Sequence, residues 1–142
     1  MNGILQIELV DTQGKVLERR VTHNLVVTDG YDELIKVLAG ESATQHYVNR
    51  MQFGTGTIAP GAGDTILSMP ISPIKNVTPT YPNGGPYRVI FEAFLLSAEG
   101  NGFPISEAGL LTPSGGLVAR AVFASVSKTT NDVLHATWQI NS

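Results

Sequence analysis

The chain has 142 residues, of which 42% are apolar and only 15% are charged, and its formal net charge is −3. Its length predicts a single domain over residues 1–142. The absence of cysteine excludes disulfide scaffolds, thiolate zinc sites and cysteine nucleophiles. The few basic residues form no stripe, so we expect no nucleic-acid partner. No apolar run is long enough for a membrane span, so we expect no membrane partner.

Residues 4–21 are predicted to form a β-hairpin. Leu5, Ile7 and Leu9 alternate with polar residues, which is the period of a half-buried strand. A turn segment at 11–14 separates them from the second strand. Because an open strand edge can add to a neighbour's sheet, residues 1–21 are a candidate assembly arm. We expect that they can be deleted without unfolding the rest of the chain.

One helix is predicted, beginning at Thr28 or Asp29, since either side chain can cap free backbone N–H groups. Gly40 is placed to end it. Apolar residues with helical spacing predict a single packed stripe: Tyr31, Leu34, Ile35 and Leu38. A helix of about ten residues has to dock on a sheet to persist.

The rest of the chain is predicted to be β structure. Short apolar runs bounded by turn residues indicate strands near 46–53, 87–96, 105–111, 117–126 and 133–140. Residues 54–86 form a long Gly/Pro-rich excursion, which either holds a short strand near 74–77 or reaches a neighbouring subunit. The expected fold is mainly β, an antiparallel β-sandwich or open barrel with one short packed α-helix.

No motif indicates an enzyme. The run 53–57 has the glycines of a phosphate loop but lacks the Lys and Ser/Thr that follow them in such loops. Asp64 lies in a turn without a catalytic partner at a recognisable spacing. His23, His46 and His135 are scattered without the spacing of metal ligands. We therefore expect no catalytic residue, no metal and no cofactor.

Glu107 is a lone acid between apolar neighbours in the segment 105–111. It is either an acid in a pocket or a structural carboxylate, one that accepts backbone N–H groups at a bend or pairs with Arg120 or Lys128 across the sheet. We favour the second interpretation, because a buried carboxylate without a partner is costly. Gly109 then allows a close approach that a side chain would block.

Aromatic residues offer a different interpretation, a platform that stacks on sugar rings. Among Tyr47, Tyr81, Tyr87 and Trp138, only Tyr81 lies in a segment expected to be exposed. Tyr87 and Trp138 lie on strand faces and are expected in the core. A carbohydrate-binding module that uses Tyr81 therefore remains an alternative.

Several short segments, in order, resemble small structural proteins of tailed bacteriophages. The first is the Asn24-Leu25-Val26-Val27-Thr28 run before a helix, and the second is Phe53-Gly54-Thr55-Gly56-Thr57 with Asp64, Thr65 and Leu67. The third is Ile105-Ser106-Glu107-Ala108-Gly109-Leu110 with Leu117, Ala119, Arg120, Lys128 and Trp138. The match spans residues 23–140 except for 69–86.

The resemblance implies a non-enzymatic subunit of a virion, synthesised in the cytoplasm of a host bacterium. The tail, baseplate or tail-fibre attachment is the expected place, with the neck or collar and capsid decoration as alternatives. The expected partners are other virion proteins and copies of the chain itself. The motif residues are then expected to hold the fold or a subunit contact: Asn24, Gly54, Gly56, Asp64, Glu107, Gly109, Arg120, Lys128 and Trp138. Low charge points the same way, since average proteins are about a quarter charged and assembled subunits cover part of their surface.

Overall fold

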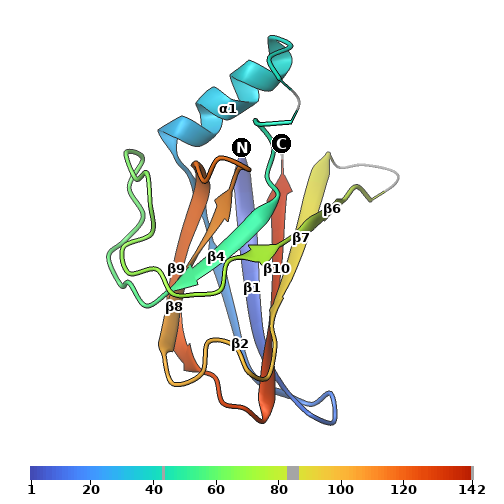
Figure 1. Ribbon diagram of the computed structural model, residues 1–142, viewed down its shortest axis with the longest axis vertical. Coiled ribbons are helices and arrows are strands. Elements are labelled where there is room, and N and C mark those ends of the chain that lie inside the picture. Colours follow the sequence, from blue (N-terminus) through green and yellow to red (C-terminus); the bar gives the residue numbers. More distant parts are fainter. Residues whose placement is uncertain (43, 83–86, 142) are drawn as a thin grey trace.

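Two five-stranded antiparallel sheets face each other in the computed structural model, which describes residues 1–42, 44–82 and 87–141 (Figure 1). The first sheet has the order β2-β1-β10-β7-β6 and the second the order β3-β9-β8-β4-β5. The first sheet comprises β1 (Asn2–Asp11), β2 (Val16–His23), β6 (Thr78–Thr80), β7 (Arg88–Leu95) and β10 (Asp132–Asn141). The second comprises β3 (Leu25–Val26), β4 (Arg50–Gly54), β5 (Lys75–Asn76), β8 (Pro104–Leu111) and β9 (Leu117–Ser127). The predicted antiparallel sandwich is confirmed.

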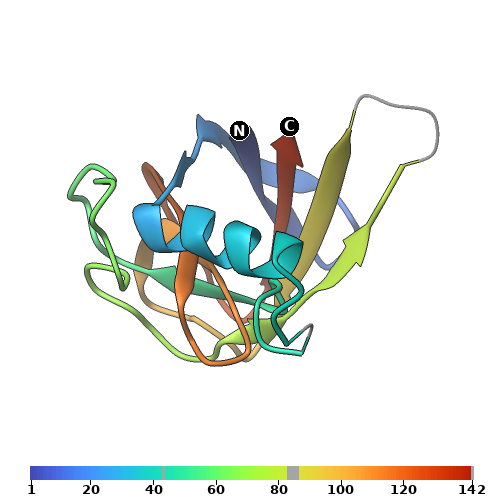
Figure 2. The ribbon, with the colours of Figure 1, turned by 90° about the horizontal axis from the view of Figure 1, so that it is seen from above.

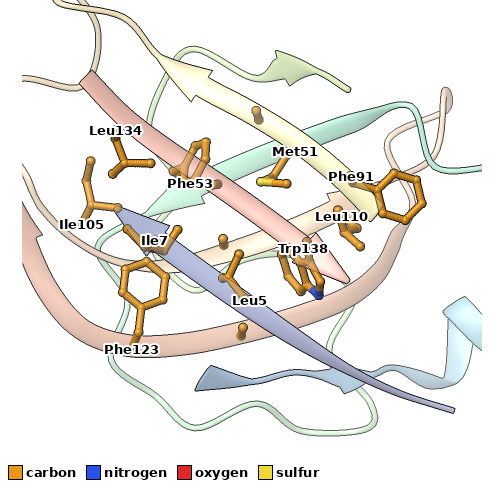
Figure 3. Close-up of a cluster of buried hydrophobic side chains, with 14 of the residues drawn as sticks. Leu5, Ile7, Met51, Phe53, Phe91, Ile105, Leu110, Phe123, Leu134 and Trp138 are labelled. Carbon is orange, nitrogen blue, oxygen red and sulfur yellow. The ribbon is translucent and has the colours of Figure 1, made fainter. Parts of the chain in front are cut away.

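Alternating residues of both sheets fill the space between them (Figure 3). On β10, Leu134, Ala136 and Trp138 are buried, as the period-2 pattern predicts. The labelled core residues come from strands of both sheets: Leu5, Ile7, Met51, Phe53, Phe91, Ile105, Leu110, Phe123, Leu134 and Trp138. This packing fixes the two sheets relative to each other and supports the loops on their outer faces.

The N-terminal hairpin is part of this core rather than an arm. β1 lies between β2 and β10 and pairs with β10 along its whole length. Its residues Leu5, Ile7 and Leu9 belong to the main hydrophobic cluster. The expectation that residues 1–21 can be deleted without loss of folding is therefore corrected, because deletion would remove a central strand.

The outer edge of β2 is held against the second sheet by polar side chains. Arg20 Nε donates to the carbonyl oxygen of Ala124 at 3.1 Å, and Thr22 Oγ1 donates to that of Val122 at 3.2 Å. Both acceptors lie on β9. These bonds close one side of the sandwich and occupy carbonyl groups that an added strand would need.

Helix α1 (Thr28–Leu38) lies at the end of the sandwich where both chain termini are found (Figure 1). Gly40 has φ +77° and follows the helix, as predicted. The helix begins at Thr28, one of the two predicted start residues. The predicted cap is wrong, because the capping position is Val27, whose side chain is apolar and makes no cap hydrogen bond. Instead, the Thr28 N–H donates to the carbonyl oxygen of Ala62 at 2.8 Å.

The predicted packed stripe of α1 is also wrong. Gly30 is the buried residue of the helix, and its backbone lies so close to Val118 that a Cβ would collide with the Val118 carbonyl oxygen. This contact sets which side of the helix faces β9. The stripe is consequently turned away from the sheet, with Ile35 61% and Leu38 83% exposed.

His46 is tied to the helix instead of extending β4. His46 Nδ1 lies 2.6 Å from Glu33 Oε2. The strand that the alternation predicts over 46–53 is accordingly shorter, Arg50–Gly54.

The excursion after Gly54 crosses from one sheet to the other. It folds back on β4 first, with a bridge between Gly54 and Pro70. β5 confirms the predicted short strand near 74–77, and β6 then pairs with β7 of the first sheet. The remainder of the excursion, 83–86, lies outside the described residues.

Candidate functional site

Glu107 anchors the excursion to the outer face of the second sheet. Its side chain is fully buried on β8. The backbone N–H of Met69 donates to Oε1 at 2.9 Å, and that of Ser68 donates to Oε2 at 3.3 Å. The carboxylate therefore accepts backbone donors from a segment almost forty positions earlier in the chain.

Two glycines let the excursion come this close. Gly54 lies opposite Glu107 in the β4–β8 ladder. A Cβ at Gly54 would lie 2.5 Å from Glu107 Oε1, and one at Gly56 would collide with Glu107 Oε2. The run 53–57 has these glycines because the backbone passes directly over a carboxylate.

Ser106 reinforces the same contact. Its hydroxyl donates to the carbonyl oxygen of Gly56 at 2.7 Å. The β8–β9 register shifts between Ile105 and Glu107. The ladder is irregular at the point where two neighbouring β8 side chains, those of Ser106 and Glu107, both bond to the excursion.

Arg120 on β9 neutralises the buried carboxylate. Its Nη2 donates to Glu107 Oε2 at 2.7 Å and to the carbonyl oxygen of Ile58 at 2.9 Å. Its Nη1 donates to Asp64 Oδ2 at 2.9 Å. The interpretation of Glu107 as a paired carboxylate agrees with this geometry, with Arg120 as its partner. Lys128 lies elsewhere.

Asp64 completes the network from the excursion side. It also accepts the backbone N–H of Gly61 at 2.8 Å. This backbone hydrogen bond, together with the hydrogen bond from Arg120, holds the pKa of Asp64 below its ordinary value. Burial lowers the pKa of Arg120, but its hydrogen bonds to Glu107 and Asp64 outweigh that effect and leave the pKa raised.

Apolar contacts fill the remaining space under the excursion. Leu67 is fully buried and forms a small cluster with Val27, Leu111 and Leu117. A Cβ at Gly109 would lie 2.8 Å from a methyl group of Leu117 and 2.9 Å from one of Leu67. Gly109 therefore makes room for this cluster, which is the close approach expected for it.

A shallow cavity of about 210 Å³ opens above the network. Its wall includes the exposed side chains of Ile58 and Ile66. Residues of the network and the apolar cluster complete the lining: Asp64, Leu67, Ser68 and Arg120. The charged groups at its floor are already bonded to one another, so the arrangement suits a rigid support for a loop rather than proton transfer.

The remaining motif residues lie at two other places. Trp138 Nε1 donates to Asn24 Oδ1 at 2.9 Å, which secures the link between β2 and β3. Lys128 is buried, and its Nζ donates to the carbonyl oxygen of Ser97 at 3.2 Å and to Asn101 Oδ1 at 2.8 Å. Burial holds the pKa of Lys128 below its usual range.

The exposure of one aromatic side chain differs from the prediction. Tyr81 is 73% exposed and Trp138 is buried, in line with the sequence pattern. The expectation that Tyr87 is a core residue is wrong, since it is 84% exposed. Tyr87 precedes the first residue of β7 and so lies outside the part of the strand that the second sheet covers.

Within 1–42, 44–82 and 87–141, no cluster of three or more potential metal ligands occurs. No helix in the described part of the chain is long and apolar enough to cross a membrane.

Sequence reasoning did not identify the Asp64–Arg120 pair, the Ser68 and Met69 donors or the role of Ser106. Their partners are far apart in the chain, so no local spacing could have indicated them. The chain matches no model of a protein family, and no curated protein or solved structure is significantly similar to it.

Proposed function

We propose that the protein is a non-enzymatic structural subunit of a tailed-phage virion, in the tail, baseplate or tail-fibre attachment. It works by packing against copies of itself and against other virion proteins. The proposal rests on one observation above all. Six of the motif residues that carry the resemblance converge on one network that fixes a surface loop. They are Gly54, Gly56, Asp64, Glu107, Gly109 and Arg120.

A fixed loop is what an assembly contact requires. The loop carries large exposed apolar side chains, namely Ile58, Ile66 and Met69. A rigid apolar loop loses little conformational entropy when a partner covers it, so more of the contact energy contributes to affinity. Contiguous exposed apolar side chains mark interaction sites on protein surfaces.

Labelled particles test the proposal. Antibodies raised against the purified protein and coupled to gold are applied to the phage particles that the same genome encodes. We expect label at one end of the tail, and label at the neck or over the capsid would select the collar or decoration alternative. Particles that carry no label, and contain no such protein by mass spectrometry, would contradict the proposal.

A carbohydrate-binding receptor-recognition module is the second candidate, favoured by the exposure of both Tyr81 and Tyr87. Flat exposed aromatic rings stack on sugars. Glycan arrays with the wild-type protein and with Tyr81→Ala test it. Binding that the substitution abolishes supports this candidate, and absence of binding removes it.

A further inference from the structure

The net charge of the chain is concentrated around α1. Residues 28–41 contain Asp29, Asp32, Glu33 and Glu41 against a single base, Lys36. They carry the whole formal charge of −3, and the rest of the chain is formally neutral. Lys36 is already paired with Asp32 at 2.8 Å.

This acidic helix also presents an apolar ridge. Because Gly30 packs against β9, another side of the helix is turned away from the sheet. That side carries three exposed apolar residues, each one turn from the next: Tyr31, Ile35 and Leu38. We call these three residues the helix face. An eleven-residue helix with one buried residue gains stability when a partner covers such a ridge.

A second surface, which carries basic rather than acidic residues, lies on another side of the same end of the molecule. Residues 65–91 contain Lys75 and Arg88 and no acid, and Lys75 is paired with Glu99. Tyr81, Tyr87 and Arg88 form what we call the ribbon patch. Among the described residues no carboxylate pairs with Arg88, and its buried Nε has no hydrogen-bond partner.

We infer that the helix face of one copy binds the ribbon patch of the next copy. This inference deepens the proposed function and rests on it. The helix face exposes Tyr31, Ile35 and Leu38, and the ribbon patch exposes Tyr81 and Tyr87. The helix is acidic, whereas Arg88 gives the ribbon patch a positive charge. The ribbon of β6 and β7 projects sideways from the sandwich, whereas α1 lies across a different side (Figure 2). The two surfaces can therefore meet between molecules placed side by side.

Because the two surfaces differ, the contact is heterologous and repeats from copy to copy. Repetition closes into a ring or continues as a filament. The acidic helix favours the ribbon patch over a second helix, since two α1 segments would bring like charges together. The cation of Arg88 favours this acidic partner over a neutral glycan.

The test is sedimentation of the full-length wild-type protein and of four further samples over a range of concentrations. These are Leu38→Gln, Tyr87→Gln, an equimolar mixture of the two, and the control Leu17→Gln, which changes an exposed apolar residue on β2. Circular dichroism checks that each variant folds, and Ile35→Gln and Tyr81→Gln replace any that does not.

We expect the wild-type protein and the control to form oligomers that weaken as salt concentration rises. Each variant alone weakens association by at least about tenfold. The mixture forms dimers and stops there, because one intact helix face then meets one intact ribbon patch.

Three outcomes would overturn the inference. A wild-type protein that stays monomeric at every concentration has no such contact. Loss of association in Leu38→Gln but not in Tyr87→Gln indicates pairing of helix with helix. Glycan binding that depends on Tyr87, without self-association, assigns the ribbon patch to a sugar. None of these removes gold label from the particle, so failure of the inference is distinguishable from failure of the proposed function.

Discussion

Glu107 and Arg120 lie on neighbouring strands and meet at 2.7 Å, with both side chains closed off from solvent. The pair bonds at the same time to the backbone of the excursion at Ile58, Ser68 and Met69. Burying two charges is costly, and here the cost is offset by hydrogen bonds to a loop that has no regular secondary structure to hold it. The ion pair therefore fixes the conformation of the loop.

Removing one partner should be strongly destabilising. Glu107→Gln leaves the Arg120 charge buried with only Asp64 to balance it, and we expect a loss of about 3–5 kcal/mol in the free energy of unfolding. Urea denaturation followed by Trp138 fluorescence measures it. The control is Arg19→Gln, which breaks the surface pair with Glu8 and should cost less than about 1 kcal/mol. If both substitutions lower the free energy of unfolding equally, the buried ion pair stabilises the protein no more than the surface pair does.

Gly56→Ala tests the close passage of the backbone over the carboxylate. The new methyl group meets Glu107 Oε2 and also lies 2.5 Å from the Ser68 Cβ. We expect a loss of about 1–3 kcal/mol in urea denaturation, the usual cost of overpacking. Gly63→Ala is the matched control, because nothing lies within 4 Å of its added Cβ. A Gly56→Ala protein as stable as this control would contradict the geometry.

The sequence predicted the strands better than the contacts between distant segments. Period-2 alternation placed Leu5, Ile7 and Trp138 in the core, because alternation on a strand directly reports which face is covered. The Glu107 segment was recognised as unusual because a charge among apolar residues needs a partner. The Asp64–Arg120 bond joins residues 56 positions apart, and no local pattern encodes such a pair.

The orientation of α1 shows why periodicity was not enough. The apolar stripe exists in the sequence, and such a stripe normally packs inward. One backbone contact, Gly30 against Val118, decides the rotation of the helix and turns the stripe outward. The spacing of apolar residues correctly predicts a helix, but it does not predict which side of the helix packs against the sheet.

Stability should depend on pH through Asp64. The pKa of this group in the folded protein lies below its ordinary value of 3.8. The charged Asp64 carboxylate therefore makes its full contribution to the free energy of unfolding above that value. This contribution is lost as pH falls through the lower pKa of Asp64 in the folded state. Chemical denaturation at several pH values, compared with Asp64→Asn, measures it.

The difference in stability between wild type and Asp64→Asn should be largest near neutral pH and should shrink in acid. A difference that stays constant across the acid range would mean that the Asp64 carboxylate is not held in its charged form by Gly61 and Arg120.

Asn24→Ala tests the bond that secures the link between β2 and β3. Trp138 is the only tryptophan, and its buried Nε1 would lose its acceptor. We expect a loss of about 1–3 kcal/mol, the cost of leaving a buried donor unpaired. Fluorescence-detected urea denaturation measures it, and Asn131→Ala, at an exposed turn, is the control. Unchanged stability of Asn24→Ala would show that another group accepts the Trp138 N–H.

Deletion of residues 1–21 should unfold the domain. β1 supplies Leu5, Ile7 and Leu9 to the core and is the strand on which both β2 and β10 pair. Without it, β10 loses its hydrogen-bonded neighbour along one edge, and β2 no longer closes the side of β9 through Arg20 and Thr22. We expect the truncated chain to lose cooperative thermal unfolding in circular dichroism, whereas Leu17→Gln keeps it. A truncated chain that still melts cooperatively would make the hairpin a separable arm, and its open β10 edge would then be available to a neighbouring subunit.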